Sequence, residues 1–142
     1  AHPGVSHIAD YATLENLLEA QVVSSDSSGG LTELSVGDVR LLAPYVPGTP
    51  GDSVMISVRA GDIIVSQDAL TGISARNVVP AAIEEINVLD ARVLIYADVG
   101  LRVVVEITPA ALTELALRKG QRIYLIIKTN SIMVLETPSA ES

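Results

Sequence analysis

Two short segments of the chain combine hydrogen-bond donors with positive charge and contain no carboxylate. One is Ser74-Ala75-Arg76-Asn77, at the entry to an apolar stretch, and the other is Lys128-Thr129-Asn130-Ser131, directly after the apolar run IYLII. A tetrahedral oxyanion only accepts hydrogen bonds, so its site must be built from donors: a guanidinium fork, hydroxyls and free backbone N–H groups. The two segments therefore predict an oxyanion site.

The same residues also allow an interpretation without a ligand. In that case Arg76 pairs with a surface carboxylate, Asn77 caps a turn and Lys128 is solvated. The spacing of these residues is compatible with both interpretations.

Enzyme motifs are absent from the sequence. There is no GxxxxGK[ST] loop and no GxGxxG after a strand, so this chain is not expected to bind or hydrolyse ATP. The two histidines, His2 and His7, lie at the N-terminal end, where neither a metal site nor a catalytic triad is expected. Glu84 and Glu85 are adjacent, which on a strand directs them to opposite faces, and they are interpreted as surface charge.

Composition narrows the class of protein further. The net charge is −8 with nine Lys and Arg, which argues against nucleic-acid binding. No apolar run approaches the roughly 18 residues of a membrane helix, so no membrane insertion is expected. The absence of cysteine excludes disulfides and thiolate metal sites. Apolar residues make up 49%, drawn from Val, Ile, Leu and Ala without Phe or Trp, which favours a β-sheet protein.

The elements that must position the two donor segments belong to an internal repeat. Aligning Asn16 with Asn77 places TLENLLE over SARNVVP, and PGDSVMISVRAGDIIVS (50–66) matches KGQRIYLIIKTNSIMVL (119–135) with Arg59 on Lys128. Two copies are therefore predicted, over about 12–67 and 73–137, joined by a polar link from Gln67 to Gly72.

Within each copy the pattern is mostly that of strands. Apolar residues alternate over 101–107 and 53–58, and the run 123–127 is typical of a strand covered on both faces. Turns are predicted at 24–30 and 47–52. The fold class is therefore mainly β, as two tandem small β-barrels of the oligomer-binding (OB) type.

One short helix is predicted, in the second copy only. Thr108 is its N-cap, Pro109 its first residue and Lys119-Gly120 its C-terminal stop. Leu112 and Leu115 provide its apolar face.

At this point the sequence resembles a known family. SARNVVPAAIEEI (74–86), EITPAALTELALRKGQ (106–121) and IIKTNSIMVL (126–135) are similar to the molybdate-binding-protein domain, also called the molbindin, Mop or transport-associated OB (TOBE) domain. The first copy, 12–67, resembles this domain more weakly and is a degenerate Mop-like OB domain. HIADYATLENLLEAQVV (7–23) resembles the junction that follows an importer's ATPase domain, so 1–11 are assigned to an N-terminal junction, and 138–142 are expected to be a disordered tail.

The resemblance implies where an oxyanion is held. In the family the Ser-Ala-Arg segment of one chain meets the Lys segment and the helix start of a neighbour. The implied ligands here are Ser74, Ala75 through its backbone N–H, Arg76, Thr108, Lys128 and Thr129, with Ser131 as a further candidate. Many relatives carry a hydroxyl where this chain has Ala111, which is a departure from the pattern.

The implied function is a cytoplasmic regulatory domain of an ABC importer ATPase, placed at the inner face of the membrane with its permease subunits. It would bind molybdate or tungstate between the two chains of a dimer and reduce uptake. The alternatives are a ligand-free dimerisation tail, a free-standing molybdate storage protein, and the effector half of a molybdate-responsive repressor.

Overall fold

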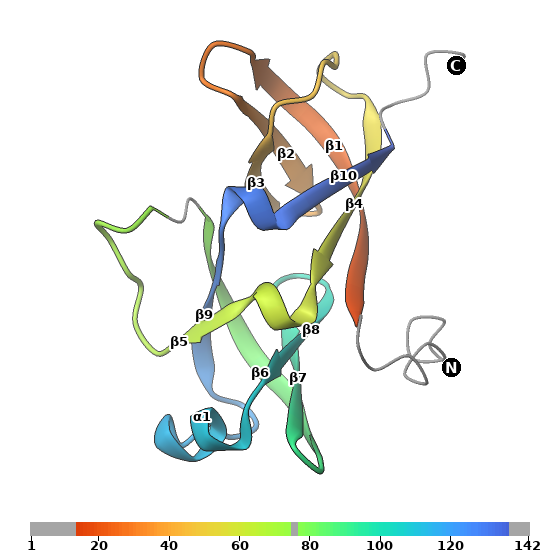
Figure 1. Ribbon diagram of the computed structural model, residues 1–142. Helices are drawn as coiled ribbons and strands as arrows, with labels where there is room; N and C mark the ends of the chain where they lie inside the picture. The colour runs from red at the N-terminus through yellow and green to blue at the C-terminus, as the bar shows by residue number, and fades with distance from the viewer. Residues whose placement is uncertain (1–13, 75–76, 137–142) are drawn as a thin grey trace.

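The computed structural model describes residues 14–74 and 77–136 (Figure 1). The predicted junction at 1–11 and the predicted tail at 138–142 lie outside these residues. The mainly β class is confirmed, because the described chain forms two five-stranded sheets and one α-helix. The elements are β1 (Glu15–Asp26), β2 (Leu31–Val36), β3 (Val39–Pro44), β4 (Ser53–Arg59), η3 (Ala60–Asp62), β5 (Ile64–Ser66), β6 (Asn77–Leu89), β7 (Arg92–Asp98), β8 (Arg102–Ile107), α1 (Pro109–Glu114), β9 (Arg122–Ile127), η4 (Thr129–Ser131) and β10 (Ile132–Glu136).

The internal repeat is visible in the strand order. The first sheet runs β10-β4-β1-β2-β3 and the second runs β5-β9-β6-β7-β8, all with antiparallel neighbours. Even the irregularities repeat, since the register shifts between Val22 and Ser24 in β1 and between Ile83 and Glu85 in β6. A bulge bends a strand and increases its twist. The long first strands of the two copies, β1 and β6, are therefore bent at equivalent positions, which lets each sheet curl.

The last strand of each copy belongs to the sheet of the other copy. β5 follows the first copy's four strands in sequence but pairs with β9, with Val65 opposite Leu125. β10, at the end of the second copy, pairs with β4, with Ile132 opposite Val58. The two OB-like barrels are therefore interlocked, and neither sheet consists of one contiguous copy (Figure 1).

The alternating patterns place one continuous core inside both barrels. Val54, Ile56 and Val58 of β4 point inward, as the sequence predicted, and so do Val103 and Val105 of β8. The apolar run in β9 is buried at four of its five predicted positions, which confirms a strand covered on both faces. Side chains from the two sheets meet in a single cluster, so apolar burial stabilises both barrels together.

The helix begins where the sequence predicted and ends earlier. The Thr108 hydroxyl oxygen accepts a hydrogen bond from the Ala111 N–H (3.1 Å), which confirms it as the N-cap before Pro109. The predicted stop at Lys119-Gly120 is wrong, since α1 ends at Glu114. Ala116 has a φ of 50°, which breaks the helix and turns Leu117 into the core.

Both predicted turns are confirmed, although β1 continues into the first of them as far as Asp26. The Asp26 carboxylate accepts hydrogen bonds from the backbone N–H groups of Ser28 and Gly29 at the hairpin between β1 and β2. The hydrogen bond from Gly29, followed by that from the Ser28 side chain, lowers the pKa of Asp26.

Candidate oxyanion-binding site

A buried asparagine lies at the start of the second copy and contacts the first. Asn77 Nδ2 donates to the carbonyl oxygens of Leu42 in β3 (3.0 Å) and Ile127 in β9 (3.1 Å), and Asn77 Oδ1 accepts from the Leu42 N–H (2.7 Å). The residue is only 4% exposed. A buried amide must be hydrogen-bonded to be tolerated, and these three bonds satisfy both ends of it. Asn77 therefore has a structural role inside a sheet, rather than the role of a turn cap in the interpretation without a ligand.

The first copy has an asparagine in the same place. Asn16 Nδ2 donates to the carbonyl oxygens of Val58 in β4 (3.2 Å) and Val104 in β8 (2.9 Å), and Asn16 Oδ1 accepts from the Val104 N–H (2.8 Å). Each copy thus uses one asparagine to hold its own strand pair and one strand of the other copy. The two residues occupy equivalent positions in the two copies, and each connects its own barrel to the other one.

The charges next to the first asparagine balance. Glu15 precedes Asn16 and Arg59 follows Val58, and these two charged residues are Cα partners on β1 and β4. An acid and a base therefore occupy opposite backbone positions, and the Glu15 carboxylate accepts a hydrogen bond from the Ser57 hydroxyl.

The charges next to the second asparagine have the same sign. Asn77 is the Cα partner of Ile127. Arg76 directly precedes Asn77 in sequence, and Lys128 directly follows Ile127. Arg76 and Ala75 lie outside the described residues. In the part of the chain that the structure describes, no carboxylate forms an ion pair with Lys128. The second copy thus carries two cations where the first carries an acid and a base.

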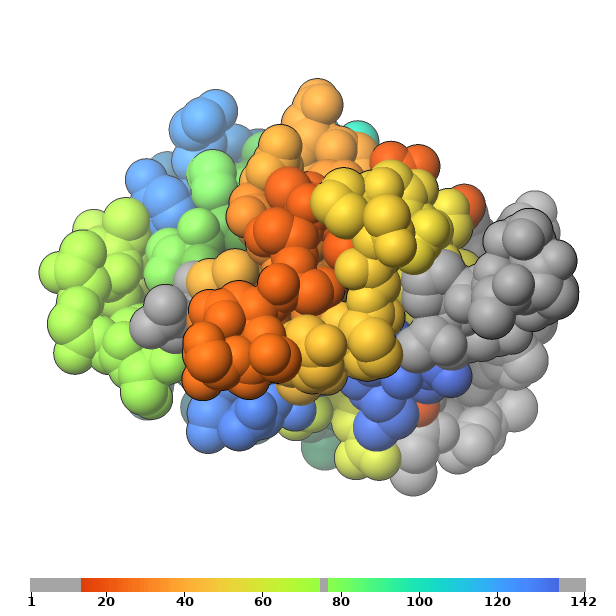
Figure 2. All heavy atoms as spheres, turned by 90° about the horizontal axis from the view of Figure 1, so that it is seen from above, coloured from red at the N-terminus to blue at the C-terminus, as the bar shows by residue number. Residues whose placement is uncertain are grey.

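The groups around Lys128 suit an incoming anion. Lys128 is exposed and immediately precedes the turn η4, in which its carbonyl oxygen accepts from the Ser131 N–H (2.9 Å). Thr129 Oγ1 is buried and has no hydrogen-bond partner among the residues described. Ser74 is exposed, at the end of a link that projects from one side of the molecule (Figures 1 and 2). Lys128 and Thr129 directly follow Ile127, the Cα partner of Asn77, so they lie next to the start of β6.

Thr108 lies elsewhere in the same chain. It is exposed at the start of α1 and lines an open hollow of about 400 Å³ with Arg59, Gly61, Asp62 and Glu106. The turn η4, which follows Lys128, instead lies against β3, and Figure 1 shows it well separated from α1. One chain therefore does not bring Thr108 to Lys128.

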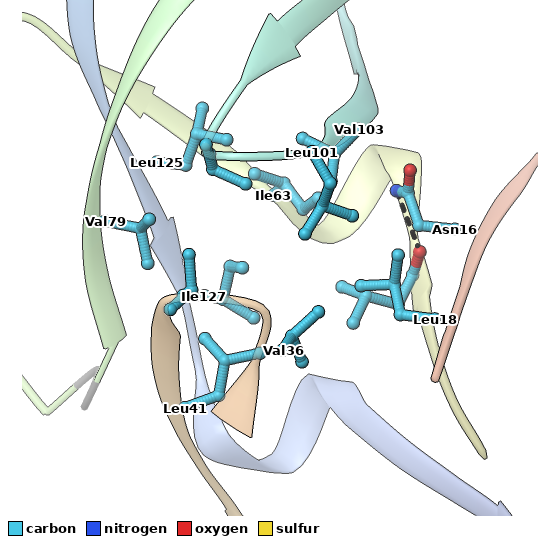
Figure 3. Close-up of a pocket in the computed structure, with 13 residues that line it drawn as sticks. Asn16, Leu18, Val36, Leu41, Ile63, Val79, Leu101, Val103, Leu125 and Ile127 are labelled. Atoms are coloured by element: carbon cyan, nitrogen blue, oxygen red, sulfur yellow. Dashed lines mark hydrogen bonds between the residues drawn. The ribbon is translucent and has the colours of Figure 1, made fainter. Parts of the chain in front are cut away.

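The aliphatic pocket in the described part of the molecule is not an oxyanion site. It has a volume of about 30 Å³ and lies between the two barrels, with Val36, Leu41 and Leu125 pointing into it (Figure 3). Every lining residue except Asn16 is aliphatic, and the Asn16 amide is already bonded to backbone. Moving an unpaired ion into such a medium costs tens of kcal/mol. The cavity therefore serves packing alone.

Filling this cavity is expected to stabilise the protein. Val36→Ile adds one methylene toward the empty space, which corresponds to about 0.8 kcal/mol and a rise in melting temperature of roughly 3 °C. The matched control is Val93→Ile, since Val93 is fully buried and does not line the cavity. Overpacking there is expected to cost about 1–3 kcal/mol. Thermal unfolding followed by circular dichroism would contradict the prediction if both variants melted below the wild type.

Two classes of feature are excluded for the described residues. They contain no group of three His, Asp or Glu side chains that could hold a metal ion. Within residues 14–74 and 77–136, no helix is long and apolar enough to cross a membrane.

Sequence reasoning located the donors but missed their connection to the other barrel. The repeat aligned Asn77 with Asn16, but nothing in the sequence around Asn77 indicated that its partner would be Leu42, 35 residues earlier. It also did not place Thr108 beside Arg59, because that proximity results from the interlocking of the two copies. The equivalence of Arg59 and Lys128 in the repeat was the one feature of the sequence that could have indicated a related position for these two cations.

Comparison with known proteins agrees with these features. Residues 73–134 match the TOBE domain. The molybdenum import ATP-binding protein ModC of Yersinia pestis is 29% identical over 117 residues, covering 82% of this chain and 33% of that protein. ModC of Rhizobium johnstonii is 31% identical over 115 residues, covering 80% and 32%. The chain thus spans about a third of the length of these relatives.

A solved structure supports the fold. The cytoplasmic molybdate-binding protein ModG, in a form with molybdate bound, superposes with a TM-score of 0.73 over 84% of this chain and 94% of its own, at 18% identity. The prediction of tandem OB-like domains is therefore confirmed. Residues 73–134 thus match the TOBE domain family, and over four fifths of its length the chain resembles part of molybdenum import ATP-binding proteins.

Proposed function

We propose that this chain is an oxyanion-binding regulatory module of a cytoplasmic importer ATPase, with molybdate or tungstate as its ligand. Its relatives are named for molybdenum import, and a protein of the same fold binds molybdate. The two oxyanions are tetrahedral dianions of nearly equal size, so one donor set suits both. The module binds and does not catalyse.

The pair of like charges beside Asn77 carries this proposal. In the repeat, Arg76 corresponds to Glu15 and Lys128 to Arg59, so two cations replace an acid and a base. A dianion that contacts both cations would offset their repulsion and accept charge-assisted hydrogen bonds from them. Thr129 directly follows Lys128 and Ser74 lies two residues before Arg76 in sequence, so both can add uncharged donors.

A complete ligand set requires two chains. Ser74, the Ala75 N–H, Arg76, Lys128 and Thr129 come from one chain, and Thr108 comes from its neighbour. This assignment follows from the separation of Thr108 from η4 within one chain. The Thr108 oxygen already accepts from Ala111, so its hydroxyl proton remains available to a ligand. The assembly is a homodimer with the oxyanion at the interface.

Binding between two chains provides a means of regulation. The oxyanion would favour the arrangement of the dimer in which both halves of the site meet, and it can shift the equilibrium only by its difference in affinity for the two arrangements. In an importer, that arrangement would reduce uptake when the cytosol is replete. The permease subunits and the ATPase domain are the partners through which this signal would pass.

Calorimetric titration tests the proposal. Molybdate should release or absorb heat with the wild type, and sulfate, which is smaller, should give little. Arg76→Ala and Lys128→Ala should each weaken binding about 10- to 100-fold, since a hydrogen bond to a charged group contributes roughly 1.5–3 kcal/mol. Arg122→Ala is the control, because Arg122 is an exposed cation at the opposite end of β9 from Lys128 and should leave the affinity unchanged. Absence of heat from molybdate in the wild type would refute the proposal.

A ligand-free dimerisation tail is the second candidate. It is favoured by an apolar patch on the outer face of β1, β4 and β10, where Leu17, Met55, Met133 and Leu135 are exposed. Ala111, which replaces the hydroxyl residue of many relatives, also favours a tail that binds no ligand. The titration above separates the candidates, since a tail of this kind would associate without binding molybdate.

A further inference from the structure

We infer that Asn77 is a positioning residue for the oxyanion site and couples the donors of that site to the first barrel. This inference rests on the proposed function, because it concerns the same donors. Asn77 belongs to no implied ligand set and contributes through the groups that it holds.

The Asn77 amide joins β6 to β9, the strand that Lys128 directly follows. Asn77 is bonded covalently to Arg76, and its Nδ2 holds the carbonyl oxygen of Ile127 (3.1 Å), the residue directly before Lys128. The backbone directly before Lys128 is therefore anchored to one buried side chain. In metal sites, loss of a group that orients a ligand lowers the affinity about 10- to 100-fold, and we expect an effect of the same order for the donors of an anion.

The same amide reaches across to the first copy. Leu42 in β3 gives both its N–H and its carbonyl oxygen to Asn77 (2.7 and 3.0 Å), and the turn η4 after Lys128 also lies against β3. A ligand that fixes the backbone on either side of Asn77 therefore also fixes the contact with Leu42. This provides a contiguous connection from the donors to the other barrel.

Asn16 makes the equivalent hydrogen bonds in the first copy, where the donors proposed for the oxyanion site are absent. Its three hydrogen bonds, to Val58 and Val104, match those of Asn77 in number and nearly in length, and it is 7% exposed. Its neighbouring charges are an acid and a base instead of two cations. The structural contribution of the two asparagines is therefore matched, and they differ in what lies beside them.

Paired variants of the whole chain separate the positioning role from the structural one. Asn77→Ala and Asn16→Ala are expected to lower the melting temperature by similar amounts. Titration with sodium molybdate should show binding weakened about 10- to 100-fold in Asn77→Ala, the range found when a ligand-orienting group is removed, and changed less than twofold in Asn16→Ala. Equal effects of the two variants on affinity would overturn the inference. If the wild type itself binds no molybdate, the proposed function fails and the inference fails with it.

A second measurement needs no variant and holds even if Asn77→Ala does not fold. The Leu42 and Val104 amides each donate to an asparagine Oδ1, at 2.7 and 2.8 Å. Hydrogen exchange of the wild type, followed by NMR, should slow at Leu42 when molybdate is added, by at least tenfold more than at Val104. Equal slowing at both amides would report only general stabilisation by a ligand and would overturn the inference, as would no slowing at Leu42 under saturating molybdate.

Discussion

A chain that ends at Ser131 is expected to lose its first barrel, although every residue of the first copy is still present. The deletion removes β10, whose Ile132 is 1% exposed and pairs with Val58. Loss of a buried Ile side chain alone costs about 2–5 kcal/mol, and the β4 edge also loses its hydrogen-bonded partner. Against a typical total stability of about 5–15 kcal/mol, this is a large fraction.

Urea unfolding followed by circular dichroism measures this loss, and NMR locates it. The resonances of β4 should broaden or disappear, whereas those of β9 should persist. The control is a chain that ends at Glu136, which keeps all ten described strands and should unfold at the wild-type urea concentration. Equal unfolding midpoints for the two truncated chains would contradict the assignment of β10 to the first barrel.

The second large effect concerns which fragment behaves as an independent barrel. Residues 73–137 are one copy by sequence but lack β5, so the outer edge of β9 is left unpaired at Leu125. An exposed edge recruits another strand. Since β10 follows η4 as β5 follows η3, the β10 of one fragment can occupy the place of β5 in another. We expect this fragment to form an interlocked dimer.

The matched fragment is 60–131, which contains β5 and β6 to β9 in one continuous stretch. It should be monomeric, because its sheet is complete. Size-exclusion chromatography with light scattering distinguishes the two fragments by mass. A monomeric, cooperatively folded 73–137 together with an aggregating 60–131 would show that sequence copies, rather than observed sheets, define the folding units.

Much of this architecture could be predicted from the sequence because it depends on local patterns. Alternation placed Val103 and Val105 inside, and Thr108 with Pro109 fixed the helix start. The helix end was missed because Ala116 adopts a positive φ that alanine rarely shows. Tertiary packing of Leu117, rather than the expected glycine, ends that helix.

The exchange of β5 and β10 could not be predicted in the same way. β5 (IVS) and β10 (IMVLE) suit either sheet, since both copies offer an equivalent apolar edge strand. Pattern and propensity decide that a segment is a strand, and only the geometry of the turns η3 and η4 decides which partner it reaches. For the site, residue types led to the prediction of Lys128 and Thr129 as ligands, but the association of Thr108 with Arg59 depends on the same exchange.

The exchange also sets the order in which the chain can fold during its synthesis. The four contiguous strands of the first copy are complete once Arg59 has been made, but their fifth partner ends at Glu136, 77 residues later (136 − 59). At about 5–20 residues per second, the β4 edge therefore waits roughly 4–15 s for β10. The second barrel has all of its strands by Ile127, so the part of the protein translated last completes its fold first.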